Sequence, residues 1–179
     1  MTEFIPFNKL ARLNRQVTIS EKLNGTNGTI YIGDDGEFLV GSRTRWITTS
    51  DDNFGFARWA EENKQELLKL GPGWHRGEWV GRGIQCNYGL KDRRFYLFNT
   101  FRWTDDAIRP SCCHVVPVLY EGAFSTFQPK SWIALLNAEG SVAFPGWKDP
   151  EGIVIYHQAA NQYFKVTCKN DESPKSLVK

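Results

Sequence analysis

The chain has 179 residues, of which 41% are hydrophobic and 23% are charged, and its formal net charge is +2. This is the composition of an ordinary globular protein with a substantial core, and the mild charge excludes a protein that binds nucleic acid through bulk charge alone. No apolar run approaches ~18 residues, so the sequence predicts no membrane-spanning helix.

The first predicted elements are β-strands. Residues 17–22 and 29–32 are rich in β-prone side chains and lie on either side of a glycine-containing turn. Residues 29–40 predict a hairpin that turns at Asp34-Asp35-Gly36. Residues 52–70 predict a helix that is capped by Ser50, Asp51 or Asp52 and is stopped by the Gly71-Pro72-Gly73 sequence.

The rest of the chain is mostly strand-like. The further expected elements are strands over 74–80, 94–103, 114–120, 151–157 and 162–168, a helix over 129–138, and a polar tail over 171–179. Many strands with two separated helices predict an α+β fold with largely antiparallel sheets. Because no linker is long enough to mark a second domain, residues 1–170 are expected to form one domain.

The cysteines and basic residues set further limits. Four cysteines lack any Cys-x-x-Cys pair and only three histidines are present, so a zinc site is poorly supported and reduced thiols in an intracellular protein are expected. Any nucleic-acid surface must be a local patch, and seven Trp and 12 Phe could add stacking to it. Candidate basic residues for that patch are Arg43, Arg45, Arg76, Arg82, Lys91, Arg93 and Arg94.

The segment from Glu21 to Gly28, EKLNGTNG, places one lysine at the end of a predicted strand. Taken alone, this pattern is typical of a hairpin turn with a solvated lysine. Lys22 is nevertheless well placed to meet a phosphate, and it can act as a nucleophile if burial or nearby cations lower its pKa.

Other segments follow this one in a fixed order. They are Ser42-Arg43-Thr44-Arg45, Gly77-Glu78-Trp79-Val80-Gly81, Phe95-Tyr96-Leu97-Phe98-Asn99, Glu151-Gly152-Ile153-Val154-Ile155 and Tyr163-Phe164-Lys165-Val166. The series resembles the nucleotidyltransferase motifs of the covalent ligase and capping-enzyme superfamily. It is most similar to the ATP-dependent RNA ligases of the phage and RNA-editing type, over about residues 17–170. The resemblance implies a nucleotidyltransferase fold, that is, an ATP-grasp-like ligase adenylation domain.

The resemblance also implies roles for three catalytic residues. Lys22 would take AMP from ATP with release of pyrophosphate, which needs positioning and charge neutralisation more than acid–base chemistry. Lys165 looks like the phosphate-contacting lysine, which would stabilise developing charge. Glu151 looks like the carboxylate that engages the divalent metal, Mg²⁺ or Mn²⁺, together with phosphate oxygens.

The nucleotide pocket follows from the same resemblance. Glu78 would accept a hydrogen bond from the ribose, and Phe98 would stack on adenine. Glu21 would face the adenine amino group. Arg43 would lie near the sugar and phosphates, with Arg45 as the alternative because residues two apart share a strand face. Asn27 would contact the nucleotide or the accepting end.

Three features depart from the family pattern. Asn24 stands where the family often has Asp or His, which leaves open a difference in lysine activation or in a later step. Thr167 replaces the usual second lysine of the last motif, so Lys169 could serve only by reaching further. No separate C-terminal domain that clamps nucleic acid is expected, which leaves open whether the chain seals ends without an accessory RNA-binding partner.

The sequence therefore predicts an ATP-dependent RNA ligase that adenylylates a 5′-phosphate end and joins it to a 3′-hydroxyl. A compact DNA or mixed-duplex ligase uses the same chemistry and remains an alternative. So does an adenylyltransferase or a nucleotide-binding module that needs a partner for sealing. The expected substrate is RNA ends or a nicked duplex, in a cytoplasmic enzyme of the kind that phages encode, and the sequence gives no oligomeric state.

Overall fold

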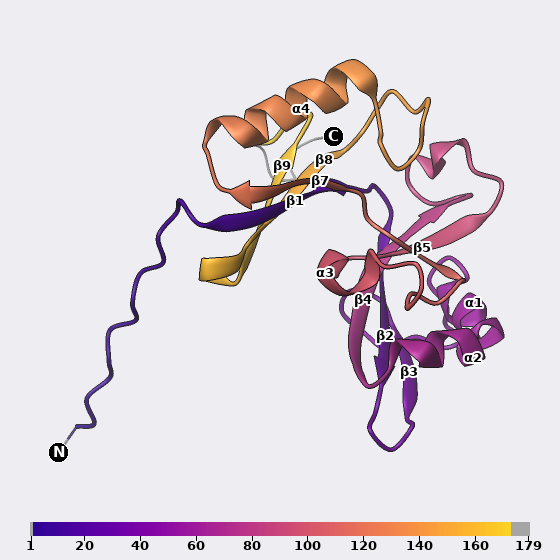
Figure 1. Cartoon of the computed structure of the whole chain (residues 1–179). Helices are drawn as coiled ribbons and strands as arrows, with labels where there is room; N and C mark the ends of the chain where they lie inside the picture. Colours follow the sequence, from indigo (N-terminus) through magenta and orange to yellow (C-terminus); the bar gives the residue numbers. More distant parts are fainter. Residues whose placement is uncertain (1, 173–179) are drawn as a thin grey trace.

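The computed structural model describes residues 2–172, which form two β-sheets with helices on their outer faces (Figure 1). Sheet A has the strand order β7 (Val118–Ala123), β1 (Gln16–Lys22), β8 (Gly152–His157), β9 (Gln162–Thr167). Sheet B has the order β3 (Phe38–Gly41), β2 (Thr26–Ile32), β4 (Gly73–Gly81), β5 (Arg93–Leu97), β6 (Cys113–Val115). All neighbouring strands are antiparallel except β5 and β6. The prediction of an α+β fold with largely antiparallel sheets is confirmed.

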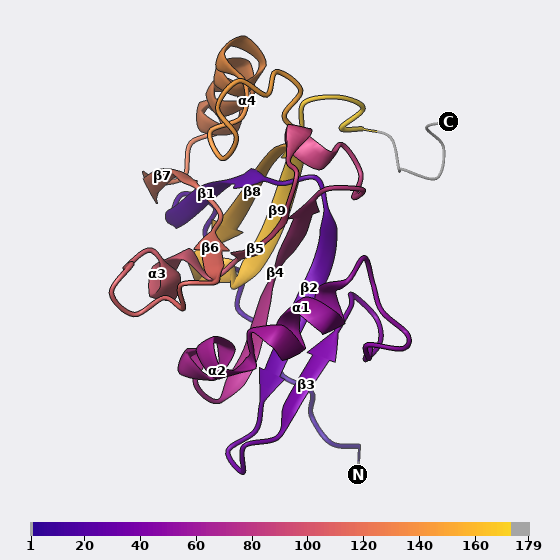
Figure 2. The same cartoon turned by 90° about the vertical axis from the view of Figure 1, so that its right-hand side faces the viewer.

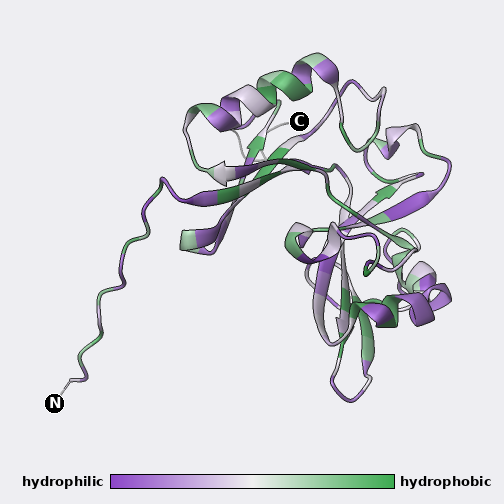
Figure 3. Ribbon diagram, in the orientation of Figure 1, coloured by the Kyte–Doolittle hydropathy of each residue, from purple (hydrophilic) through white to green (hydrophobic). Residues whose placement is uncertain are grey.

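The helices cover one face of each sheet. Helix α4 (Phe127–Glu139) packs on sheet A, where Leu136 joins a buried cluster with Val17 and Ile19 (Figures 1 and 3). Helices α1 (Phe56–Glu62) and α2 (Lys64–Leu67) pack on sheet B through Phe56 and Leu67 (Figure 2). The remaining short helices are α3 (Thr100–Trp103) and the 3₁₀ helices η1 (Leu68–Leu70), η2 (Asn87–Gly89) and η3 (Gln158–Ala160). Each sheet therefore has a second face that α1, α2 and α4 do not cover, and we call this its helix-free face.

The chain passes from one sheet to the other at two short segments. The first is residues 23–25, which join β1 to β2, and the second is residues 116–117, which join β6 to β7. The two segments are neighbours, because the Glu21 backbone N–H donates to the Pro117 carbonyl at 2.9 Å. Leu23 and Val116 also share one buried cluster. The junction of the two sheets is thus compact and lies next to Lys22.

The predicted helix over 52–70 is shorter and broken. It begins at Phe56, and α1 and α2 are separated at Asn63, whose side-chain amide donates to the Trp59 carbonyl at 2.8 Å. Asp52 provides the predicted cap, because its carboxylate accepts hydrogen bonds from the backbone N–H groups of Ala57 and Arg58. The predicted hairpin over 29–40 is confirmed by the pairing of β2 with β3.

Two predicted strands were wrong in extent. The strand over 94–103 ends at Leu97, and Asn99 then begins α3 by accepting a hydrogen bond from the Arg102 backbone N–H at 3.1 Å. The strand over 114–120 is two strands, β6 and β7, which belong to different sheets. Pro117 lies between them, and a proline has no N–H with which to continue a ladder.

The ends of the described chain carry no regular structure. Residues 3–12 contain no helix or strand and lie away from both sheets (Figure 1), with Phe4 and Phe7 exposed. Of the predicted polar tail over 171–179, residues 173–179 lie outside the described residues. All four cysteines are free thiols. Between residues 2 and 172, no helix is long and apolar enough to cross a membrane.

Candidate active site

The pleat of β1 separates two neighbouring residues of the EKLNGTNG segment. Val17, Ile19 and Glu21 are buried on the face that α4 covers, whereas Lys22 lies on the opposite face with Thr18 and Ser20. That second face carries no helix. Lys22 therefore points into the space between the two sheets.

Lys22 meets a carboxylate from the other end of the sequence. Its Nζ atom lies 2.6 Å from Oε2 of Glu151, and the two side chains are only 20% and 11% exposed. The pairing of Lys22 with Gly152 in sheet A brings Glu151 to this position, at the residue before β8 begins. The predicted nucleophile and the predicted metal carboxylate thus share one site.

Glu78 of β4 is the second carboxylate of this site. Its Oε1 atom accepts from the Gly25 backbone N–H at 3.1 Å, and its Oε2 atom accepts from the Asn27 side-chain amide at 3.0 Å. Burial raises the pKa of Glu78 to about 7; Lys22 opposes this shift and Glu151 adds to it. The group is therefore close to half-ionised at neutral pH.

Gly25 explains why the turn after Lys22 can lie so close to β4. A Cβ atom at this position would meet the Trp79 carbonyl oxygen at 2.4 Å and Val80 at 2.7 Å. Only a residue without a side chain fits over the strand here, and that close approach lets the Gly25 N–H reach Glu78. The glycine of the motif is required by packing.

A cavity of about 530 Å³ opens beside Glu78 on the helix-free face of sheet B. It brings together three residues of the predicted nucleotide pocket, Asn27, Arg43 and Phe98. Asn27 connects the cavity to the carboxylate site, because it lines the cavity and also binds Glu78. The cavity is lined by Asn27, Gly28, Thr29, Gly41, Ser42, Arg43, Thr44, Arg45, Trp46, Trp74, Arg76 and Phe98.

The basic patch expected from the sequence is divided. Arg43, Arg45 and Arg76 all line this cavity, and Arg45 forms an ion pair with Asp51. Arg94 instead lies at the other end of β4, where it pairs with Val80 across the sheet and forms an ion pair with Asp92. The cavity therefore holds three of the seven candidate basic residues.

Lys165 and Lys169 differ in their placement. Lys165 pairs with Val154 on β9, in the same row of sheet A as Ser20, so it lies on the same face as Lys22. It is exposed and stands two strands away from β1. Lys169 lies past the end of β9, and its Nζ atom is 2.5 Å from Oδ1 of Asp149. Of the two, Lys165 is on the same sheet face as the predicted nucleophile.

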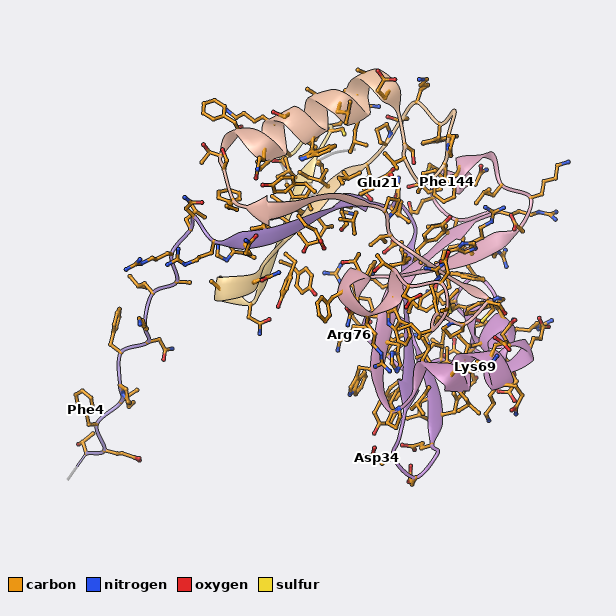
Figure 4. The ribbon with its side chains drawn as sticks, in the orientation of Figure 1. Phe4, Glu21, Asp34, Lys69, Arg76 and Phe144 are labelled. Atoms are coloured by element: carbon orange, nitrogen blue, oxygen red, sulfur yellow. The ribbon has the colours of Figure 1, made fainter. Side chains whose placement is uncertain are left out.

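The Glu21 carboxylate is hydrogen-bonded by the loop that follows α4. It accepts hydrogen bonds from the Ser141 hydroxyl at 2.6 Å and from the backbone N–H groups of Val142 at 2.9 Å and Ala143 at 2.8 Å, below α4 in Figure 4. Burial raises its pKa, although these three hydrogen bonds oppose the shift. A contact between the Glu21 side chain and adenine remains a prediction, and it would need this loop to release the carboxylate.

Two supporting residues were not predicted. The Tyr88 hydroxyl oxygen accepts from the Asn24 backbone N–H at 2.5 Å, and its ring stacks on Phe144 with centroids 4.0 Å apart. Ser141 fixes Glu21 as described. Tyr88 is 64 residues from Asn24, and Ser141 is 120 residues from Glu21. No local pattern marks contacts between residues so far apart in sequence.

A metal ion would find few protein ligands here. Within residues 2–172, no group of three or more His, Cys, Asp or Glu side chains could hold a metal by itself. Glu151 offers a single oxygen-donor side chain beside Lys22. This fits a hard ion such as Mg²⁺, which usually binds one or two carboxylates together with substrate phosphates and water.

Comparison with known families identifies the domain. A family model described as RNA ligase matches residues 15–169. The chain belongs to the RNA ligase family. A search of curated proteins gives no significant sequence match.

Solved structures of Naegleria gruberi RNA ligase share the fold of this RNA ligase family member. A mutant with ATP and Mn has a TM-score of 0.68 at 22% identity, over 88% of this chain and 51% of that chain. A mutant with AMP and Mn gives 0.67 at 23%, over 87% and 50%. The ligase with PPi gives 0.63 at 22%, over 93% and 57%. This family member spans about half the length of those RNA ligases.

Proposed function

We propose that residues 1–170 are the adenylyltransferase domain of an ATP-dependent RNA ligase, and that Lys22 carries AMP during the reaction. The observation that supports this most directly is the pairing of Lys22 with Glu151 at 2.6 Å, beside Glu78 and on the helix-free side of β1. This arrangement puts the proposed nucleophile beside the carboxylate proposed to hold the metal, in a chain that belongs to the RNA ligase family.

The first step is the transfer of AMP to the lysine. The lone pair of the neutral Lys22 Nζ attacks the α-phosphorus of ATP. A nitrogen–phosphorus bond forms, the bond from the α-phosphorus to the bridging oxygen breaks, and pyrophosphate leaves with that electron pair. Nζ must lose a proton for this attack. Because Glu151 is hydrogen-bonded to the same atom, it would have to turn away or take up that proton.

Residues of sheet B would hold the nucleotide. Glu78 would accept a hydrogen bond from the ribose, and its pKa of about 7 allows it to act with or without a proton. Phe98, half-exposed in the wall of the cavity, offers one face for adenine to stack on. Asn27 and Arg43 line the same cavity and would contact the sugar and phosphates.

Cations would neutralise the charge that develops on the phosphates. Lys165, on the same face of sheet A as Lys22, would approach the α-phosphate. A bound Mg²⁺ or Mn²⁺, held by Glu151 and phosphate oxygens, would act as a Lewis acid when present. Lys169 stays paired with Asp149 in this arrangement.

The later steps would use the AMP that Lys22 holds. A 5′-phosphate oxygen attacks the phosphorus of lysyl-AMP and releases the lysine, and a 3′-hydroxyl then attacks the activated 5′-phosphate and releases AMP. The proposed substrate is RNA, because the chain belongs to the RNA ligase family.

The four free cysteines support a reducing, cytoplasmic environment.

Incubation with α-labelled ATP and Mg²⁺ or Mn²⁺ tests the first step. A covalent label on the wild-type protein, lost in Lys22→Ala and absent with labelled GTP, is the expected result. No label on the wild-type protein would contradict the proposal. Sealing assays with RNA or DNA on each side of a nick then separate an RNA ligase from a DNA or mixed-duplex ligase. Labelling without sealing of any nick would instead indicate a domain that needs a partner.

A further inference from the structure

The helix-free face of sheet B carries an ordered row of side chains along β4. Trp74, Arg76 and Glu78 alternate with buried residues, so all three point to the same face, and successive members are ~6.6 Å apart along the strand. Figure 4 shows Arg76 on the side of the sheet away from Lys69, whereas Figure 1 shows α1 and α2 on the Lys69 side. The row therefore runs from an aromatic residue, through a cation, to the carboxylate beside Lys22.

Neighbouring strands widen the aromatic end of this row. Trp74 pairs with Tyr31 across β2, and their ring centroids are 4.9 Å apart. Trp46 stacks on Trp74 with centroids 5.5 Å apart and an angle of 22° between the rings. We call Tyr31, Trp46 and Trp74 the aromatic platform.

The platform is open to solvent. Trp46 is 46% exposed and Trp74 is 56% exposed, although indoles of a folded core are normally well buried. Neither residue belongs to the buried clusters of sheet B. Two adjacent exposed indoles on one rigid sheet are a surface on which planar ligands can stack.

The surroundings of the platform are cationic. Arg43, Arg45 and Arg76 line the same cavity as Trp46 and Trp74, and that cavity has no carboxylate in its wall. The Arg76 guanidinium lies 5.5 Å from the Trp74 ring centroid. Within residues 2–172, neither Arg43 nor Arg76 forms an ion pair. Their charges are available to an anionic ligand.

We propose that this face binds single-stranded RNA next to the end being joined, with an unpaired base stacked on the aromatic platform and a backbone phosphate at Arg76. The proposal rests on the proposed RNA ligase function. The strand would then continue past Asn27 toward Lys22, since Asn27 lines the cavity and is bound to Glu78. Stacked aromatics combined with a cationic groove are the usual means of holding single strands, and they leave base sequence unread.

The proposed ligand is single-stranded RNA because the aromatic platform can bind a base only through the face of its ring. A base presents its face only when it is not paired and stacked within a duplex. The row on β4 also places the platform about four residues, or ~13 Å, from Glu78, beyond the predicted ribose contact. The Phe98 backbone N–H donates to the Arg76 carbonyl at 2.9 Å, so the platform lies past Arg76, next to the residue proposed to stack on adenine. None of the three platform residues has a proposed contact with ATP.

Binding of a fluorescent 5′-phosphorylated, unstructured RNA to the full chain tests the proposal by anisotropy. Trp74→Ala and Trp46→Ala should each weaken binding about 5- to 100-fold, and Trp74→Phe should restore most of the affinity. Arg76→Ala should weaken binding and reduce the salt dependence by about one counterion. Phe127→Ala is the matched control, because Phe127 is an exposed aromatic on α4 of sheet A, and it should bind RNA like the wild type.

Two further measurements separate this proposal from the proposed function. Labelling of Lys22 with AMP should stay within about twofold of the wild type in Trp74→Ala, because Trp74 makes none of the proposed contacts with ATP. RNA binding should persist in Lys22→Ala, since it does not require AMP transfer. Loss of labelling in Lys22→Ala with an intact effect of Trp74→Ala on RNA binding would support both proposals independently.

Three outcomes would overturn the RNA-binding proposal. The first is unchanged RNA affinity in both tryptophan variants, or no RNA binding by the wild type. The second is a loss of AMP labelling in Trp74→Ala as large as the loss of RNA binding, which would assign the platform to ATP. The third is equal binding of the same RNA in a blunt duplex, with equal sensitivity to Trp74→Ala.

Discussion

Lys22 and Glu151 are 129 residues apart in the sequence, and their side chains meet at 2.6 Å between the two sheets. The ladder between β1 and β8 produces this contact, because it sets Lys22 opposite Gly152. The ion pair is largely shielded from water, so solvent screens the attraction between the two charges less than it would at the surface, and the contact holds the amine beside Glu151. The predicted nucleophile is thus positioned before any nucleotide arrives.

Glu151→Gln should reduce labelling of the protein with AMP by about 100-fold, because the variant loses the carboxylate proposed to hold the metal. Labelling is measured while Mg²⁺ or Mn²⁺ is titrated, and higher metal concentration should recover part of the loss. Asp149→Asn is the matched control, since Asp149 is an exposed carboxylate two residues upstream that pairs with Lys169. Equal losses in both variants would contradict the assigned role of Glu151.

Lys165→Ala and Lys169→Ala should have unequal effects. Lys165 lies on the face of sheet A that carries Lys22, so its loss should slow labelling by ~10²-fold. Lys169 forms an exposed ion pair with Asp149, and its loss should cost less than about 1 kcal/mol in stability and leave labelling within about twofold. Initial rates of labelling at saturating ATP compare the two variants. A larger effect at Lys169 would mean that the residue leaves Asp149 and reaches the phosphates.

Glu78 should make the stability of the protein depend on pH. Burial raises its pKa in the folded protein to about 7 from the unfolded value of 4.5, so the folded state binds more protons than the unfolded state between these values. The free energy of unfolding should therefore fall as pH rises from 4.5 to 7, and then level off. Glu78→Gln should reduce this dependence, leaving the part that comes from Glu21, whose pKa burial also raises, and gain on the order of 1 to 3 kcal/mol at pH 8. Urea unfolding at several pH values measures it, and a flat wild-type profile would be inconsistent with the raised pKa.

Glu21→Ala should destabilise the fold by roughly 2 to 4 kcal/mol, because it leaves the Ser141 hydroxyl and the Val142 and Ala143 N–H groups without their acceptor. Urea unfolding measures the loss, with Glu61→Ala as the control at an exposed helix position. The control should change stability by less than about 0.5 kcal/mol. A small effect at Glu21 combined with weaker ATP binding would favour the predicted role at adenine.

Local patterns in the sequence were sufficient for much of the site. The spacing from Lys22 through Gly25 to Asn27 indicated a turn between two strands, and β1 and β2 confirm it. The predicted strand over 74–80, which carries Glu78, is likewise confirmed by β4. These features depend on residues within a few positions of one another, so periodicity and turn chemistry can predict them.

Long-range features could not be predicted in the same way. The strand predicted over 114–120 is in fact two strands in different sheets, on either side of Pro117. A short apolar run in the sequence does not reveal which sheet each part joins. The stack of Trp46 on Trp74 joins the segment after β3 to β4, and a helical segment separates the two in the sequence. Arg76 was predicted as part of a basic patch, but its place beside Trp74 needed the register of sheet B.

The two short crossings between the sheets have a mechanical consequence. Any opening or closing of the molecule must turn about residues 23–25 and 116–117, which are hydrogen-bonded neighbours through Glu21 and Pro117. A point close to a rotation axis travels least, and Lys22 is the residue that directly precedes the first crossing. Lys165 and Trp74 lie on different sheets, so such a turn would change the distance between them. Lys22 would therefore keep its place while the groups proposed to hold its substrates move relative to each other.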